Sequence, residues 1–161
     1  MDLDKSIRIA QDHFKENKKL VQQLKKKKPK DLDIITTDLH YEVFERIDCL
    51  ACANCCKSIS PIVTDKDIQR IARHLKQKPS DFVESYLNLD LENDYVFKNQ
   101  PCPFLGADNY CSIYSVRPKA CAEYPHTDRK KFQQLLNLSL KNTSICPAVT
   151  EVFIGLKKHY K

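Results

Sequence analysis

Apolar residues in the first thirty positions recur at alternating spacings of four and three, a pattern that predicts one long amphipathic helix. Its seam consists of Leu3, Ile7, Ala10, Phe14, Asn17, Val21 and Leu24. Pro29 ends this pattern, and Asp31 is placed to cap a second helix. The apolar face of the second helix is Leu32, Ile35, Leu39, Val43 and Ile47. We expect the two helices to pack as an antiparallel hairpin, with association of two copies through the first helix as the alternative.

Shorter helices are predicted in the rest of the chain. Thr64 begins a clean amphipathic pattern whose inward positions are Ile68, Ile71, Ala72 and Leu75. Ser80 is predicted to cap the next helix, Thr127 to cap a helix that carries Phe132 and Leu136, and Pro147 to begin the last one. Between them, residues 91–124 hold short aromatic segments separated by Pro, Gly and Asn, which fit small strands or extended loops.

These patterns predict a mainly α fold, or an α+β fold with a few very short strands. Residues 1–47 form a basic helical hairpin in this scheme, and residues 48–161 form an irregular cysteine-rich centre framed by helices. The 161 residues suffice for one compact unit with its own hydrophobic core. We expect a monomer or a weak dimer.

Glycine content limits the class of protein. The chain has only Gly106 and Gly155, whereas phosphate-binding loops and dinucleotide fingerprints each need several glycines. A self-contained nucleotide-binding enzyme is therefore not expected.

The formal net charge of +6 comes largely from lysines near Lys18, in the run Lys25–Lys28 and at the C-terminus. Such patches can hold phosphate backbones or other acidic partners. Because no aromatic residues interleave these lysines, the pattern is typical of a solvated helix face, and we make no nucleic-acid claim from it. A protein partner that binds the basic hairpin is the expectation for this surface.

Eight cysteines are the main chemical feature of the sequence. The N-terminus has no apolar leader and no long apolar run follows, so we expect a cytoplasmic protein that neither enters nor binds a membrane. Cysteines in that compartment stay reduced, and eight in a short chain favour metal ligation over disulfides. The predicted ligands are Cys49, Cys52, Cys55, Cys56, Cys102, Cys111, Cys121 and Cys146.

The spacing of these cysteines indicates more than one metal ion. Cys49, Cys52 and Cys55 are three residues apart, whereas Cys55 and Cys56 are adjacent and project in different directions. Such a pair is awkward for one tetrahedral ion. Eight thiolates suit two zinc sites, or an iron–sulfur cluster such as 4Fe–4S together with one zinc.

The order CLACANCC, CPF, CSIYSVRPKACAEYP and a last cysteine resembles the YkgJ-like cysteine-cluster family of zinc- or iron-chelating domains. The similarity spans about residues 48–147, with Ala122 and Asn54 at positions where many relatives carry Arg and Gly. It implies bound zinc or iron. Flagellin lysine N-methylases contain a similar region, so the resemblance also brings a metal-dependent protein-modifying enzyme as an alternative.

Three residues near the later cysteines are candidates to tune the metal. Arg117 is the best cation for a centre that carries about two negative charges, and Tyr114 and Tyr124 are placed to shield it or donate a hydroxyl group. Arg117 as a helix partner and the tyrosines as packing residues are the alternatives. His126 is interpreted as a surface residue, and no catalytic residue is predicted.

The sequence leaves the role of the metal open. An iron–sulfur protein acting in electron transfer is slightly favoured, because the three-residue spacing and the Cys-Pro elements resemble those of ferredoxins. A zinc-stapled interaction protein is the structural alternative.

Overall fold

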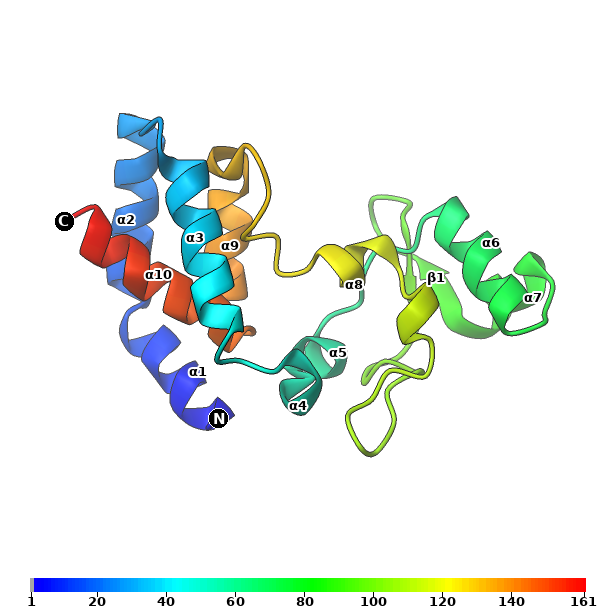
Figure 1. Ribbon diagram of the computed structural model, residues 1–161. Coiled ribbons are helices and arrows are strands. Elements are labelled where there is room, and N and C mark those ends of the chain that lie inside the picture. Colours follow the sequence, from blue (N-terminus) through cyan, green and yellow to red (C-terminus); the bar gives the residue numbers. More distant parts are fainter. Residues whose placement is uncertain (1) are drawn as a thin grey trace. The chain divides into compact units, whose positions relative to one another are not determined.

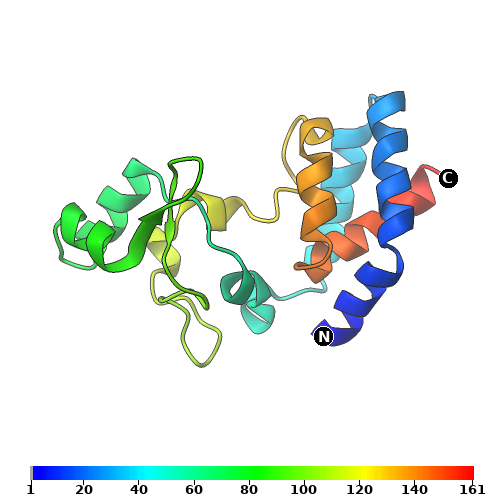
Figure 2. The same ribbon diagram turned by 180° about the vertical axis from the view of Figure 1, so that it is seen from behind.

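A computed structural model describes residues 2–161 and confirms the mainly α fold, with one small two-stranded sheet (Figures 1 and 2). The chain divides into two compact units. Unit 1 contains the residues up to Cys52 together with Pro125–Lys161, and unit 2 is Ala53–Tyr124. In residues 2–161, no helix has the length and apolar character needed to cross a bilayer.

Unit 1 is a helical bundle built around its last helix. Its elements are α1 (Leu3–Asp12), α2 (Phe14–Lys27), α3 (Leu32–Phe44), α4 (Cys49–Cys52), the 3₁₀ helix η2 (Phe132–Leu135), α9 (Leu136–Asn142) and α10 (Pro147–His159). Pro147 begins α10, as predicted, because its missing N–H is not needed in the first turn. Helix α10 contacts α1, α2, α3 and α9.

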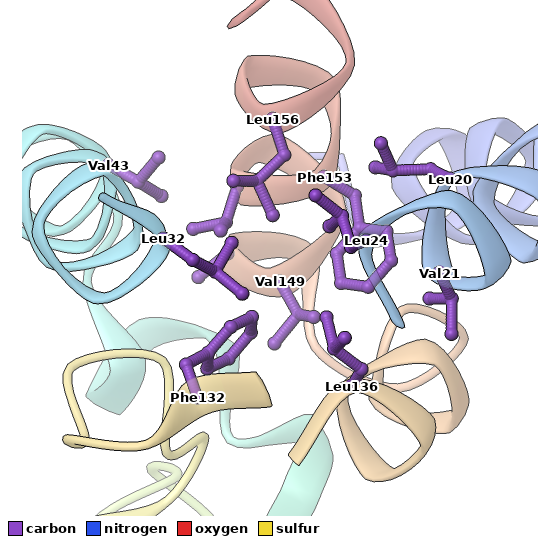
Figure 3. Packing of buried hydrophobic residues seen from close by; sticks show 12 residues of the cluster. Leu20, Val21, Leu24, Leu32, Val43, Phe132, Leu136, Val149, Phe153 and Leu156 are labelled. Carbon is purple, nitrogen blue, oxygen red and sulfur yellow. The ribbon is translucent and has the colours of Figure 1, made fainter. Parts of the chain in front are cut away.

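The core of unit 1 lies between α2 and α3. Figure 3 shows Val149, Phe153 and Leu156 of α10 facing Leu24 of α2 on one side and Leu32 of α3 on the other. The predicted hairpin helices are thus separated by α10. Helices α3 and α10 approach closely at Gly155, where an added Cβ would lie 2.4 Å from Cδ2 of Leu39.

The first helix differs from its prediction. The chain bends at His13, which ends α1 and begins α2. Four positions of the predicted seam are buried, namely Ala10, Asn17, Val21 and Leu24, whereas Phe14 at the bend is 45% exposed. The bend allows α1 and α2 each to contact α10. The second predicted helix ends at Phe44, before Ile47.

The start of η2 is fixed by a residue of α3. The carboxylate of Asp33 accepts the backbone N–H groups of Lys131 at 2.7 Å and Phe132 at 2.9 Å. This corrects the prediction that Thr127 caps the helix. Thr127 is fully buried, and its hydroxyl lies 2.7 Å from Nδ1 of His40.

Unit 2 surrounds a second hydrophobic core. Its elements are α5 (Asn54–Ser58), α6 (Asp65–His74), α7 (Pro79–Tyr86), β1 (Leu87–Leu89), β2 (Tyr95–Phe97), the 3₁₀ helix η1 (Tyr114–Val116) and α8 (Lys119–Glu123). Strands β1 and β2 pair antiparallel, with Leu87 opposite Phe97. The core residues are Val63, Ile68, Ile71, Ala72, Phe82, Leu87, Phe97, Phe104 and Ile113.

The starts of two helices in unit 2, α6 and α7, bear on the sequence predictions. Helix α6 begins directly after Thr64, where the amphipathic pattern was predicted to begin, and Thr64 caps it in a capping box that Asp67 completes. Helix α7 begins at Pro79 with Lys78 as the capping residue, so the predicted cap at Ser80 is wrong. The fixed φ of proline suits the first helical position, and this places the start of the helix before Ser80.

Candidate metal centre

The eight cysteines are all free thiols and are divided between the two units. Unit 1 contains Cys49 and Cys52 on α4 and Cys146 directly before α10. Unit 2 contains Cys55 and Cys56 on α5, Cys102 and Cys111 in the loop after β2, and Cys121 on α8. Ala53 separates α4 from α5, and its left-handed backbone, with φ of 48°, prevents one continuous helix through the cluster.

In unit 1, Cys146 lies within the electrostatic reach of Cys49 and Cys52. The pKa of Cys146 is raised to about 11, mainly by burial and also by negative charge on Cys49 and Cys52. The backbone N–H groups of Val149 and Ala148, in the first turn of α10, oppose this by hydrogen bonding to the sulfur. A cation close to these thiols would favour their thiolate forms.

In unit 2, four thiols interact with one another. The backbone N–H of Cys102 donates to the carbonyl oxygen of Cys56 at 2.8 Å, which joins α5 to the loop after β2. The pKa of Cys121 is raised to about 12, mainly by burial and also by the charges of Cys56, Cys102 and Cys111. The pKa values of Cys102 and Cys111 are also raised, first by burial and then by the charge of Cys56. Cys56 is therefore the common neighbour of the other three thiols.

Cys56 is the most acidic of these four thiols. A hydrogen bond from the thiol of Cys55 lowers the pKa of Cys56 to about 7, although burial acts in the opposite direction. The backbone N–H of Cys56 and the charge of Lys57 contribute to the lowering. The adjacent pair thus consists of one thiol that donates and one sulfur that readily becomes a thiolate.

Backbone N–H groups also point at the sulfurs of the loop. Cys102 accepts from Phe104 and Leu105, and Cys111 accepts from Ile113. Amide donors of this kind stabilise thiolates that bind zinc or iron. Thiolates are soft ligands, so the donor set of unit 2 fits either metal.

The thiol groups of unit 2 influence one another's pKa values but are not arranged as a metal coordination shell. Within residues 2–161, no three side chains of Cys, His, Asp or Glu stand in the geometry of a metal site. Metal binding by the four unit 2 thiols therefore requires their side chains to turn towards a common point.

Arg117 contributes positive charge near two of the thiols. It lowers the pKa values of Cys111 and Cys121 against the effect of burial. Its guanidinium Nη1 donates to the carbonyl oxygen of Tyr114 at 2.7 Å, and its Cζ lies 4.0 Å from the centre of the Tyr114 ring. Tyr114 is 42% exposed and holds Arg117 in place by this stacking. Tyr124 is half-buried at the end of α8.

Asp67 is a residue near the site that the sequence pattern did not identify as functional. One oxygen of its buried carboxylate accepts the N–H of Thr64 at 2.9 Å and the Thr64 hydroxyl at 2.8 Å. The other accepts Arg70 Nη2 at 2.6 Å and the backbone N–H of Lys119 at 3.1 Å. Arg70 also donates to the carbonyl oxygen of Arg117 at 2.8 Å. Asp67 thus connects α6 to the start of α8, which carries Cys121.

A signal for this connection is present in the sequence. Thr64 and Asp67 have the spacing of a capping box, in which an acidic residue follows the cap by three positions. The box predicts the start of α6. It does not predict the contact with Lys119, which is 52 residues further along the chain.

The helical fold and the thiols gathered beside backbone amides define a cysteine-rich metal-binding protein. Residues 48–146 match the CxxCxxCC family, a proposed zinc- or iron-chelating domain, and the chain belongs to this family. The match covers more than half of the chain and confirms the resemblance seen in the cysteine pattern. No curated protein and no solved structure matches the chain.

Proposed function

We propose that the protein binds metal in two separate centres, one in each unit, and that the metal is iron in an iron–sulfur form that serves electron transfer. The observation that carries the proposal is the grouping of thiols. Within unit 2, the charge of Cys56 raises the pKa values of Cys102, Cys111 and Cys121. Within unit 1, the charges of Cys49 and Cys52 raise the pKa of Cys146.

The residues of unit 2 have distinct roles in this proposal. Cys56, Cys102, Cys111 and Cys121 hold the metal. The N–H groups of Phe104, Leu105 and Ile113 stabilise the sulfurs, and hydrogen bonds of this kind set the reduction potential of a cluster. An iron–sulfur cluster supplies one-electron chemistry when bound. Arg117 offsets part of the negative charge at Cys111 and Cys121.

The metal is tested by anaerobic purification, elemental analysis and a visible absorption spectrum. We expect brown protein that contains iron and acid-labile sulfide and loses its colour on reduction. Colourless protein with about two zinc ions per chain would refute the redox role and leave the zinc-stapled module.

The number of centres is tested by comparing Cys121→Ser with Cys146→Ser. We expect each variant to lose part of the bound metal while the rest remains, and the double variant to lose nearly all of it. Loss of all metal in either single variant would show one shared centre and contradict the division by units. Cys55→Ser, measured beside them, determines whether the thiol that donates to Cys56 is itself a ligand.

A further inference from the structure

The positive charge of the protein belongs to unit 1. Unit 1 carries 18 Lys and Arg residues against 12 Asp and Glu residues, whereas unit 2 carries nine of each. The net charge of +6 is therefore the net charge of unit 1. Its distribution within unit 1 decides whether it forms a surface.

Two lysine segments about 100 residues apart meet at one end of the bundle. Gln133 of η2 donates to the carbonyl oxygen of Leu24 at 3.1 Å, and Nζ of Lys25 donates to Asn137 of α9 at 2.7 Å. The end of α2 and the turn before η2 are therefore adjacent, as Figure 1 shows at the upper end of this bundle. We define the basic end as Lys25, Lys26, Lys27, Lys28, Lys30, Lys130 and Lys131.

The lysines of the basic end are available to a partner. All seven are exposed. In the described part of the chain, none of their ammonium groups forms an ion pair, and the contact of Lys25 is with a neutral amide.

Two carboxylates that follow the lysine run in the sequence, Asp31 and Asp33, are already engaged within unit 1. Asp33 accepts the two N–H groups at the start of η2. Asp31 accepts the hydroxyl of Tyr160 at 2.8 Å and lies 3.5 Å from His159. These two carboxylates therefore hold the helix ends of unit 1 and leave the seven ammonium groups exposed to solvent.

We propose that the basic end binds the phosphate backbone of nucleic acid without reading its sequence. Lysines bind phosphates as flexible point charges, and seven of them on one surface suit the closely spaced phosphates of a duplex, which carries one negative charge per about 1.7 Å of its axis. The basic end consists of lysines alone, and contacts of lysines with phosphates carry no sequence information. The run Lys25–Lys28 alone is typical of a solvated helix end, and the juxtaposition with Lys130 and Lys131 is what favours a binding surface.

The proposal predicts a steep dependence on salt. If about five of the seven lysines contact phosphates of a duplex, the slope of log affinity against log salt is about −4.5. Binding then weakens about 500-fold between 50 and 200 mM salt. Fluorescence anisotropy of the metal-loaded full chain with two labelled 20-bp duplexes of unrelated sequence measures this slope, and both duplexes should bind alike.

A matched pair of triple variants tests the location. Lys26→Gln, Lys27→Gln and Lys130→Gln together should weaken duplex binding roughly tenfold or more at about 100 mM salt and reduce the salt slope by about 2 to 3. The control combines Lys66→Gln, Lys76→Gln and Lys78→Gln, three exposed lysines of unit 2 that lower the net charge equally. The control should bind as the wild type does.

Several outcomes would overturn the proposal. Equal weakening in the control would show a response to net charge only. Tighter binding to polyglutamate than to a duplex would identify an acidic protein as the partner, and tighter binding to vesicles rich in phosphatidylserine would identify a membrane surface. Absence of duplex binding at 50 mM salt would show a solvated helix end.

Discussion

Replacing Asp67 with alanine is expected to destabilise unit 2 and to weaken its metal binding. The Asp67 side chain is 1% exposed and accepts hydrogen bonds from Thr64, Arg70 and Lys119. Burial raises the pKa of Asp67, but these hydrogen bonds together lower it below its usual value. The carboxylate is therefore charged at neutral pH and holds the start of α6 against the start of α8.

The size of the effect follows from the lost partners. A hydrogen bond to a charged group contributes about 1.5–3 kcal/mol, and the N–H groups of Thr64 and Lys119, whose hydrogen bonds to Asp67 are partly buried, would each lose one. The Arg70 side chain is 42% exposed, so hydration of its guanidinium group offsets most of the loss of the ion pair. We expect the free energy of unfolding of unit 2 to fall by about 3 kcal/mol. Because the pKa of Asp67 is lowered in the fold, this contribution is present above pH ~4 and is lost as pH falls through the folded pKa.

Metal affinity gives a second measurement. Replacing a residue that supports a metal ligand typically lowers metal affinity about 10- to 100-fold. Asp67 supports the segment that carries Cys121. Unfolding by denaturant, with amide hydrogen exchange over α6 and α8, measures stability, and competition with a chromophoric chelator measures affinity. Asp65→Ala is the control, since Asp65 is an exposed carboxylate in the same helical turn.

Two results would refute this reasoning. If Asp67→Ala and Asp65→Ala unfold alike, the buried hydrogen bonds contribute little. If Asp67→Ala is destabilised but keeps the metal affinity of the wild type, Asp67 supports α6 alone and does not position Cys121.

Three further predictions concern unit 1. Gly155→Val should lower the free energy of unfolding by about 1–3 kcal/mol, since its Cβ would lie 2.4 Å from Leu39, and adding Leu39→Ala should recover part of the loss in a double-mutant cycle. Asp33→Ala should cost about 1–2 kcal/mol in denaturant unfolding, because the N–H groups of Lys131 and Phe132 lose their acceptor; Asp33→Asn should cost less. Burial lowers the pKa of His40, so an NMR titration of its ring should give a midpoint below 6.5. The contribution of neutral His40 to stability should be present above pH ~6.5 and lost as pH falls through the folded pKa. A midpoint at or above 6.5 would contradict the burial of this ring.

Sequence patterns predicted the elements whose signals are local. Helix α6 is recognisable from its apolar period and from Thr64, and α10 from Pro147, because the relevant contacts lie within a few residues. The start of η2 was not predictable in this way. The acceptor for its N–H groups is Asp33, 99 residues before Phe132, and no local pattern encodes that contact.

The candidate site shows the same division between local and distant information. The cysteine spacing identified the family and the eight thiols as candidates. The spacing did not show which thiols lie in the same unit. That division depends on Ala53, whose left-handed backbone separates α4 from α5. It also depends on the fold, which places Cys146 with α4 in unit 1. The contact of Asp67 with the Cys121 segment was missed for the same reason, since it requires the tertiary structure of unit 2.

Positive charge serves different purposes in the two units. In unit 2, basic and acidic residues balance, and Arg117 and Lys57 lower the pKa values of nearby thiols. These cations therefore favour the thiolates that a metal needs, and they are held there by contacts such as the stacking of Arg117 on Tyr114. In unit 1, the lysines of the basic end form no ion pairs in the described residues. Their charge is therefore available to attract negatively charged molecules from solution. Loss of metal from unit 2 should accordingly leave polyanion binding by unit 1 unchanged, whereas neutralising the basic end should leave the metal content unchanged.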